Sequence, residues 1–522
     1  MKSSFEYAAL APIILLLGAG VFSILIEAFV PRTSRRICQL FLVLSSLALS
    51  FGYVLINATR TLVGDAATNG GQTHGLRQFA VNGATVIDGA GLFLQGTLLL
   101  IAFVAALLMA ENQIDPQGDA FAARSSTLPG SEDERQFTAQ GWTQTEIWPL
   151  FLFCVGGMVL FPVANDFLTM FVALEVFSLP LYLMAGMARR RRLLSQEASL
   201  KYFVLGAFSS AFFLFGAALI YAVTATMNFG QVSVALESAG QDSLVITGIG
   251  MIAVGLLFKV GAVPFHQWTP DVYQGSPTPL TAFMGAATKV AAFGALLRVF
   301  YVAFGGMRWD WRPMFWVVAI LTMLVGSILA VTQTDIKRML AFSSIAHAGF
   351  LLLGVIATSA SGLSSSLLYL FAYGFTTIGS FAVVSLVRDA AGEATHLSQW
   401  AGLGKKSPVV ASIFALFLLA LAGIPLTSGF TGKFAIFTAA IEGGATPLVI
   451  VAVIASAIAA FFYARVIVLM FFTEPAVDGP NVVIPSSFTK IAIGVSAAVT
   501  LLVGVLPQPL IDVIVSAGLF AS

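Results

Sequence analysis

The sequence predicts an all-α polytopic membrane protein with about 14 transmembrane helices. Two inverted five-helix repeats are expected, each with a discontinuous helix. The chain has 522 residues, of which 58% are hydrophobic and only 10% charged. Its mean hydropathy of +0.93 lies far above that of soluble domains. Apolar runs long enough to cross a bilayer recur along the whole chain, and two of them are too long for one straight helix.

The apolar runs define the expected helices and the division of the chain. Their approximate spans are 6–30, 37–57, 86–110, 147–163, 167–188, 198–225, 244–274, 277–304, 313–332, 336–357, 362–388, 407–440, 446–472 and 488–507. The first run lacks the basic front and small-residue cleavage site of a signal peptide, so we expect it to be retained. The expected segments are an N-terminal three-helix segment (1–110), a cytoplasmic acidic loop (111–146), a first repeat (147–304), a second, inverted repeat (313–472) and a C-terminal helix (488–507).

An internal repeat relates the two halves of the chain. The helix DFLTMFVALEVFSLPLYLMAG from Asp166 resembles the later helix DIKRMLAFSSIAHAGFLLLGV from Asp335. The helices that follow them, LKYFVLGAFSSAFFLFG and LLYLFAYGFTTIGSFAV, also correspond. Because each unit has five helices, the second copy must cross in the opposite sense. Inverted repeats with one broken helix each are typical of ion-coupled transporters, whose binding site lies at the breaks.

The two overlong spans contain the expected breaks. The helix-break residues are Gly261, Pro264, Gly423 and Pro425. Proline lacks an N–H and clashes with the carbonyl four residues earlier. The carbonyls of Val260 and Leu421 therefore lose their helical partners. Such free backbone groups are tolerated at membrane depth only where they face protein or water.

Lys and Arg residues in the short loops predict the orientation. The basic loops are 32–36, 189–192, 337–338 and 388–406. With fourteen spans, all four lie on one side of the membrane, which is then the cytoplasmic side. Both chain termini are predicted on the non-cytoplasmic side.

Ionisable side chains lie within the apolar runs, where a charge costs roughly 2.5–3.5 kcal/mol on insertion scales. The candidate site residues are Glu175, Lys259, Lys289, Lys433 and His347, with Lys201 at the start of the sixth span and His266 as a possible inner-mouth residue. Burial shifts the pKa values of carboxylates and amines toward neutrality, and a nearby opposite charge shifts them back. A pair such as Glu175 and Lys259 could therefore load and release a proton near pH 7. The set predicts a path for protons or ions.

Each of these residues also has a structural interpretation. Glu175 and Lys259 could form a static buried salt bridge. Lys201 could extend to the inner surface, and His347 could be a hydrogen-bonded core residue. A glycine-rich phosphate loop, a dinucleotide fingerprint and a Cys/His cluster are all missing from the sequence, so no metal or redox cofactor is expected. The net charge of +1 suggests no nucleic-acid partner.

One segment carries a specific resemblance. KVGAVPFHQWTPDVYQGSPTPLTAFMGAATKVAAFGALLR, residues 259–298, resembles the antiporter-like subunits of respiratory complex I. The form FHQWTPDVYQGSPTP, together with EASLKYFVLGAFSSAFFLFG at 197–216, is similar to the subunit N family of bacterial NADH-quinone oxidoreductases. That family is the counterpart of mitochondrial subunit two. IKRMLAFSSIAHAGF and GIPLTSGFTGKF match it too, and the similarity extends over roughly residues 145–472.

The resemblance implies proton translocation driven by quinone reduction in other subunits. It implies a non-redox subunit of the enzyme, without a quinone, flavin or iron–sulfur site. The implied partners are other membrane subunits and the lipid bilayer, in the bacterial plasma membrane. By position, Glu175 resembles the family's glutamate on helix five, and Lys259 resembles the lysine on helix seven that pairs with it. Lys289 resembles the linking residue on helix eight, and Lys433 resembles the exit-side lysine on helix twelve. His347 resembles the histidine that bridges the two halves, and Lys201 resembles a lysine on helix six.

Other functions remain open from the sequence. A subunit of a multi-subunit sodium/proton antiporter or of a membrane-bound hydrogenase shares the same core, but FHQWTPDVYQGSPTP favours the quinone oxidoreductase. A stand-alone solute transporter is disfavoured because the lysine row is not accompanied by a substrate-sized polar cluster. A structural scaffold predicts that Lys259→Ala changes assembly but not coupling.

Overall fold

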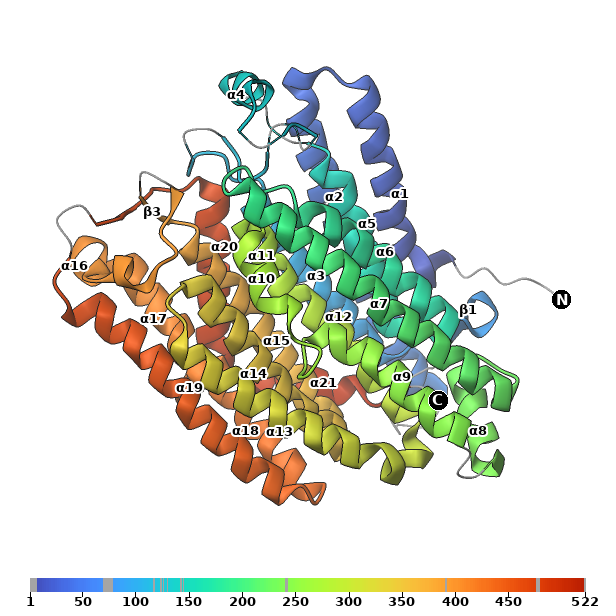
Figure 1. The fold of residues 1–522 in the computed structure, drawn as a ribbon. Helices are drawn as coiled ribbons and strands as arrows, with labels where there is room; N and C mark the ends of the chain where they lie inside the picture. Colours follow the sequence, from blue (N-terminus) through green and yellow to red (C-terminus); the bar gives the residue numbers. More distant parts are fainter. Residues whose placement is uncertain are drawn as a thin grey trace.

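A computed structural model describes residues 7–68, 78–115, 118–122, 124, 126–128, 130–140, 143, 145–239, 243–389, 392–475 and 479–520. Long helices lie alongside one another in a bundle, with short strands and loops at its ends (Figure 1). The prediction of an all-α polytopic membrane fold is confirmed.

The helices follow the apolar runs closely. Those of the first half are α1 (Tyr7–Phe29), α2 (Arg32–Thr68), α3 (Gly89–Met109), α4 (Glu132–Ala139), α5 (Ile147–Leu160), α6 (Phe167–Ala185), α7 (Arg192–Thr224), α8 (Phe229–Ala239), α9 (Ser243–Val260), α10 (Trp268–Gly275), α11 (Thr278–Phe283) and α12 (Lys289–Arg298). Those of the second half are α13 (Arg308–Thr332), α14 (Ile336–Ala357), α15 (Ala360–Val384), α16 (Leu403–Lys406), α17 (Pro408–Ala422), α18 (Ser428–Glu442), α19 (Thr446–Phe472), α20 (Ser487–Val505) and α21 (Gln508–Ala517).

Short elements connect these helices. Strands β1 (Gln78–Ala80) and β2 (Thr85–Ile87) form an antiparallel hairpin, and β3 (Val387–Asp389) pairs antiparallel with both β4 (Gly392–Glu393) and β5 (Asn481–Val482). Single 3₁₀ turns are η1 (Val81–Gly83), η2 (Phe161–Val163), η5 (Gly305–Met307) and η6 (Leu397–Trp400). Two π-helical turns, η3 (Met284–Thr288) and η4 (Val299–Ala303), flank α12. The π turn η3 directly precedes Lys289, and such turns are frequent at functional sites.

Within the described residues, 12 helices are long and apolar enough to cross a membrane by length and composition. The remaining two predicted spans correspond to the shorter helix α5 and to the interrupted pair α17–α18. The count of fourteen crossings therefore stays a prediction. Helix α7 begins at Arg192 and α13 at Arg308, several residues before their apolar runs, because hydropathy marks the membrane part of a helix rather than its end.

The bundle has fully buried central helices and outer helices with exposed apolar faces. In the apolar windows of the segments 278–303 and 336–357, 100% of the residues are buried. Helices α2 and α19 instead expose large apolar side chains, such as Phe41 at 75% and Phe472 at 81%. Polar side chains on the central helices are therefore separated from lipid by surrounding protein.

Both predicted helix breaks are confirmed. Helix α9 ends at Val260, and Gly261 has a φ of +72° before α10 begins. Helix α17 ends at Ala422, and Gly423 has a φ of +85° before α18 begins. Glycine tolerates this left-handed conformation without the steric cost that a Cβ atom brings. The glycines at these positions therefore allow the two helices to end where the sequence predicts.

The basic loops lie on one face of the bundle. Asp115 pairs with Arg190, which follows α6, at 2.6 Å, and also with Arg388, which follows α15. Arg36, in the first basic loop, donates to the carbonyl of Ala110 at 2.6 Å. We call this face the inner face. Helix α9 runs toward it and α17 begins beside it, so the two broken helices cross in opposite senses, as the inverted repeat predicts.

Candidate proton path

Lys259 occupies a buried site between α9 and α6. Its side chain is 1% exposed. Its Nζ donates to the Oγ of Ser178 at 2.7 Å and to the hydroxyl of Tyr182 at 3.0 Å. It also lies 5.1 Å from the centre of the Tyr182 ring and 5.5 Å from that of Phe177. Neutral hydroxyls and the faces of aromatic rings thus surround the amine.

Glu175 lies on α6, about one turn before Ser178. In the described part of the chain it forms no ion pair with Lys259, and its Oε1 is buried without a hydrogen-bond partner. A static salt bridge between the two residues therefore does not join α6 to α9 in this conformation. An unpartnered buried carboxylate oxygen is costly and marks a place where a proton or water would be stabilised.

Lys289 binds the open end of the first broken helix. It is 3% exposed. Its Nζ donates to the carbonyl of Val260 at 3.0 Å and to that of Ser344, on α14, at 2.5 Å. The carbonyl predicted to lose its helical partner at this break is therefore satisfied by a lysine of the next membrane segment.

Lys433 repeats this arrangement in the second half. It is 4% exposed, and its Nζ donates to the carbonyls of Leu421 at 3.0 Å and Ala422 at 2.9 Å. A third donation, at 2.9 Å, reaches the Oγ of Ser456. The negative end of a helix dipole stabilises a nearby cation. Each broken helix thus offers its carboxyl end to a buried lysine.

Hydroxyl groups occupy the space between the two halves. His347, on α14, bonds through Nδ1 to the hydroxyl of Tyr369 at 2.6 Å and through Nε2 to that of Tyr463 at 3.4 Å. The hydroxyl of Tyr373 donates to the Oγ of Ser344 at 2.9 Å. Since the Ser344 carbonyl also accepts from Lys289, a polar cluster extends from the first break toward His347.

Lys201 and His266 lie apart from this row. Lys201 is exposed at the inner face and pairs with Asp271 at 2.8 Å and Glu197 at 2.7 Å. His266, in the segment between α9 and α10, is half-buried, and its Nδ1 has no partner in the described structure. The structure therefore joins neither side chain to Lys259 or Lys289.

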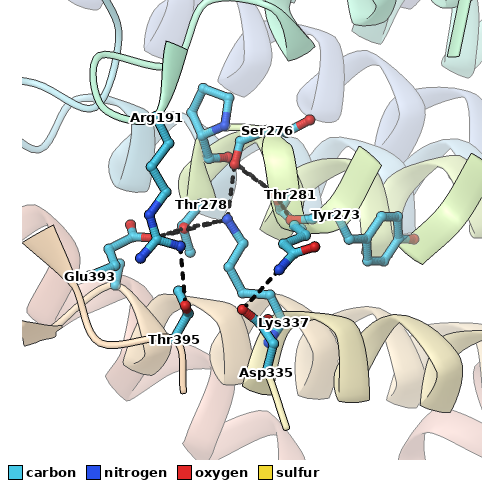
Figure 2. Close-up of polar contacts among 12 residues, drawn as sticks. Arg191, Tyr273, Ser276, Thr278, Thr281, Asp335, Lys337, Glu393 and Thr395 are labelled. Atoms are coloured by element: carbon cyan, nitrogen blue, oxygen red, sulfur yellow. Dashed lines mark hydrogen bonds and ion pairs between the residues drawn. The ribbon is translucent and has the colours of Figure 1, made fainter. Parts of the chain in front are cut away.

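Lys337 is a residue that the sequence analysis treated only as a loop charge. It lies in the first turn of α14, is 2% exposed, and donates to the carbonyl of Ser276 at 2.9 Å and to the Oγ1 of Thr278 at 3.0 Å. Glu393 lies 3.9 Å from its Nζ. Figure 2 shows the amine between Arg191 and Glu393 on one side and Thr281 and Tyr273 on the other. Its position at the start of an apolar run could have indicated that Lys337 is buried. Lysines that set the orientation of a membrane helix occur at the same position, however, so the sequence does not separate the two cases.

A cavity of about 90 Å³ opens beside Lys337 on the inner face. Its lining includes Arg191, Thr278, Lys337, Glu393 and Thr395. Beyond Lys337, the Oγ1 of Thr281 donates to the carbonyl of Tyr273 at 3.2 Å, and the Tyr273 hydroxyl lies 3.5 Å from the Oγ of Ser344. Polar groups therefore recur between the inner face and the cluster around Lys289, with the ring of Tyr273 between them.

Comparisons with known proteins show the family of the chain. Residues 164–462 match the family model described as NADH:quinone oxidoreductase/Mrp antiporter, TM. The chain is 56% identical over 532 residues to NADH-quinone oxidoreductase subunit N 3 of Streptomyces griseus, covering 99% of this chain and 94% of that protein. It is 53% identical over 525 residues to subunit N of Mycobacterium tuberculosis, covering 97% of each.

The chain belongs to the subunit N family of NADH-quinone oxidoreductases.

Chains of solved structures share the fold. A chain of respiratory complex I from Thermus thermophilus is 30% identical, with a TM-score of 0.76 and coverage of 97% of this chain and 100% of that one. A chain of the Mrp complex from Dietzia is 22% identical, with a TM-score of 0.77 and coverage of 97% of each, and shares the fold. The prediction of an antiporter-like, proton-translocating membrane subunit of an NADH-quinone oxidoreductase is confirmed at the level of the family.

Among the described residues of this chain, no group of three or more His, Cys, Asp or Glu side chains could hold a metal ion. The buried row consists of amines, one imidazole, hydroxyls and carbonyls, which donate or accept the hydrogen bonds described above.

Proposed function

We propose that protons cross the chain along the buried row formed by Lys259, Lys289, His347 and Lys433. Quinone reduction in other subunits of the complex drives this movement. Glu175 adjusts the charge around Lys259, and the inner cavity beside Lys337 supplies protons from the cytoplasm. The observation that carries the proposal is the pair of buried lysines that bind the open carboxyl ends of the two broken helices.

The ligands of these amines suit proton transfer. Lys259, Lys289 and Lys433 are held by neutral carbonyl and hydroxyl oxygens, and the described structure gives none of them a carboxylate within ion-pair distance. A buried amine with neutral ligands can release a proton to a neighbouring hydroxyl or water without breaking an ion pair. The same amine in a tight salt bridge would hold its proton more firmly.

The redox chemistry belongs to partner subunits, and this chain contributes no cofactor. Its inner face, with the basic loops, faces the cytoplasm, and both termini lie on the opposite side of the bacterial plasma membrane. Lys201 and Asp271 anchor α10 at the inner mouth near His266.

Proton pumping by the assembled complex tests the proposal. Lys259→Ala and Glu175→Ala should lower proton pumping and coupled quinone reductase activity by roughly tenfold or more, because each removes a titratable group of the row. Lys405→Ala, which removes an exposed lysine paired with Glu474, should leave both unchanged. Immunoblots of the purified complex check assembly. Normal pumping by both assembled row variants would refute the proposal and favour a scaffold role.

A further inference from the structure

A second polar site lies at the inner end of the bundle, away from the proton row. It is a groove of about 350 Å³ between the end of α13, the turn that leads into η6, and α19. Its lining residues are Thr334, His396, Leu397, Ser398, Arg465, Val466, Val468, Leu469 and Thr473. Thr334, His396, Ser398 and Thr473 are exposed, so the groove is open to its surroundings.

Arg465 is the charged group of this groove. It is exposed on α19, and its Nη1 donates to the carbonyl of Val331 at 3.2 Å. In the described part of the chain it has no carboxylate partner. Phe461 lies one turn before Arg465 on α19, and Val468 and Phe472 lie about one and two turns after it; they are 60%, 53% and 81% exposed. Arg465 therefore projects from an exposed apolar stripe, about 10 Å from the inner end of the helix.

An arginine in this position is suited to bind an anion. A charge on a lipid-facing surface is costly at membrane depth, and a long side chain lowers that cost by reaching the polar interface. The planar guanidinium binds phosphate oxygens through two parallel hydrogen bonds. Its exposed N–H groups thus match the phosphodiester of a membrane lipid.

The rest of the groove matches the same ligand. His396, Ser398 and Thr473 offer hydrogen bonds around a headgroup, whereas Val468 and Leu469 line an apolar wall beside Arg465. The groove belongs to the inner face, since Leu397 donates to the carbonyl of Thr334 at the start of α14. That face carries the basic loops, and the cytoplasmic leaflet is rich in anionic lipids.

We propose that this groove binds the headgroup of an anionic glycerophospholipid of the inner leaflet. The phosphate lies on the Arg465 guanidinium, and an acyl chain lies along the apolar wall of α19. A carboxylate from a neighbouring subunit is the competing occupant, which the experiment below distinguishes from lipid. The site is independent of the proton row.

Photolabelling of the assembled complex in nanodiscs tests this site. The probe is phosphatidylglycerol with a diazirine on one acyl chain, and the matched probe is phosphatidylcholine with the same label. Peptides from α19 and the end of α13 should be labelled preferentially by the phosphatidylglycerol probe, and unlabelled phosphatidylglycerol should compete better than phosphatidylcholine. Arg465→Ala should lower this labelling about fivefold, as expected for the loss of one basic contact with an anionic membrane.

A matched variant and the wild-type competition make the test decisive. Lys490 is an exposed cation near the inner end of α20 and does not line this groove. Lys490→Ala should leave labelling at α19 unchanged, and Arg465→Lys should retain more labelling than Arg465→Ala. Equal labelling by both lipids in the wild-type complex would overturn the proposal. So would cross-linking of the α19 peptides to a neighbouring subunit instead of to lipid.

Discussion

At the scale of single residues, the three buried lysines Lys259, Lys289 and Lys433 all donate their hydrogen bonds to neutral oxygens. Lys289 and Lys433 each donate to backbone carbonyls freed by a helix break. Lys259 donates to two hydroxyls, while Glu175 remains outside its contact distance. The sequence identified these residues because charge is rare in apolar runs. It could not identify their ligands, because every residue has a backbone carbonyl and the sequence does not show which one a lysine contacts.

Removal of the Tyr369 hydroxyl tests the path between the two halves of the chain. The hydroxyl lies 2.6 Å from Nδ1 of His347. Tyr369→Phe should lower the pumping rate of the assembled complex several-fold, because proton transfer then lacks one hydrogen-bonded partner, with an effect on stability of about 1 kcal/mol. The rate of pumping in reconstituted vesicles measures this. As a control, Tyr221→Phe changes an exposed tyrosine of α7 and should pump normally; equal rates in both variants would exclude Tyr369 from the path.

At the scale of elements, the breaks in α9–α10 and α17–α18 are the most accurately predicted feature of the site. Glycine and proline act locally, so their effect is visible in the sequence. The π turn η3 before Lys289 was not visible, since residues 284–288 carry no distinctive pattern. Its residues are all buried in the core.

A pair of glycine substitutions within one broken helix tests the first break. Gly261→Ala would place a Cβ at a φ of +72° and 2.9 Å from the Oγ1 of Thr269. The left-handed conformation costs about 1–2 kcal/mol for a non-glycine residue. The substitution should therefore lower the thermal stability of the complex and its pumping, because the Val260 carbonyl shifts from Lys289.

Gly250→Ala provides the matched control. Gly250 lies inside α9, and nothing lies within 4 Å of its Cβ position. Alanine there should be neutral or stabilising by up to about 1 kcal/mol. If both variants lowered the unfolding temperature equally, the left-handed turn at Gly261 would not be the cause.

Glu111 ties the loop after α3 to the start of α20. Its carboxylate accepts from the backbone N–H and Oγ of Ser486, at 2.9 and 2.6 Å, and from the Oγ1 of Thr489 at 2.6 Å. Desolvation raises the pKa of Glu111, but these hydrogen bonds and that from the Gln113 N–H outweigh it, so the pKa lies below the ordinary value of 4.5. The folded state therefore favours the charged form.

The pH dependence of unfolding tests the role of Glu111. Because the folded pKa is depressed, the stabilisation is complete above the unfolded pKa and is lost as the pH falls through the folded pKa. Glu111→Gln should lower the unfolding temperature at pH 7 and flatten its decline below about pH 5. Thermal unfolding of the complex over this pH range measures the effect. Glu474→Gln, at an exposed carboxylate, should leave the profile unchanged.

At the scale of the whole molecule, one loop carboxylate joins the two repeats at the inner face. Asp115 bonds to Arg190 of the first repeat at 2.6 and 2.9 Å and also to Arg388 of the second. Its side chain is 7% exposed. Through Asp115, the acidic loop 111–146 therefore connects the two halves of the chain. Asp115 also lines the cavity beside Lys337.

Removal of this bridge should loosen the inner face. Asp115→Asn removes the carboxylate that Arg190 and Arg388 share, while Arg388 keeps Glu393 at 4.0 Å. The loss of this shared, buried carboxylate should cost about 2 kcal/mol. The unfolding temperature should fall, and Lys337 should become more reactive toward an amine label. Glu132→Gln, in the same loop, breaks a pair whose side chains are 74% and 70% exposed and should cost less than about 0.5 kcal/mol. Equal shifts in the two variants would contradict the bridging role.

The sequence by itself determined the membrane-spanning character, the positions of the breaks, the repeat and the identity of the buried lysines. These properties follow from hydropathy and from backbone preferences that act over a few residues. Only the tertiary structure decided that Lys433 meets Leu421, that Glu175 is separated from Lys259, and that Lys337 is buried. Those contacts depend on how helices distant in the sequence pack together, and a hydrophobic pattern specifies which surface of a helix is buried but not which partner buries it.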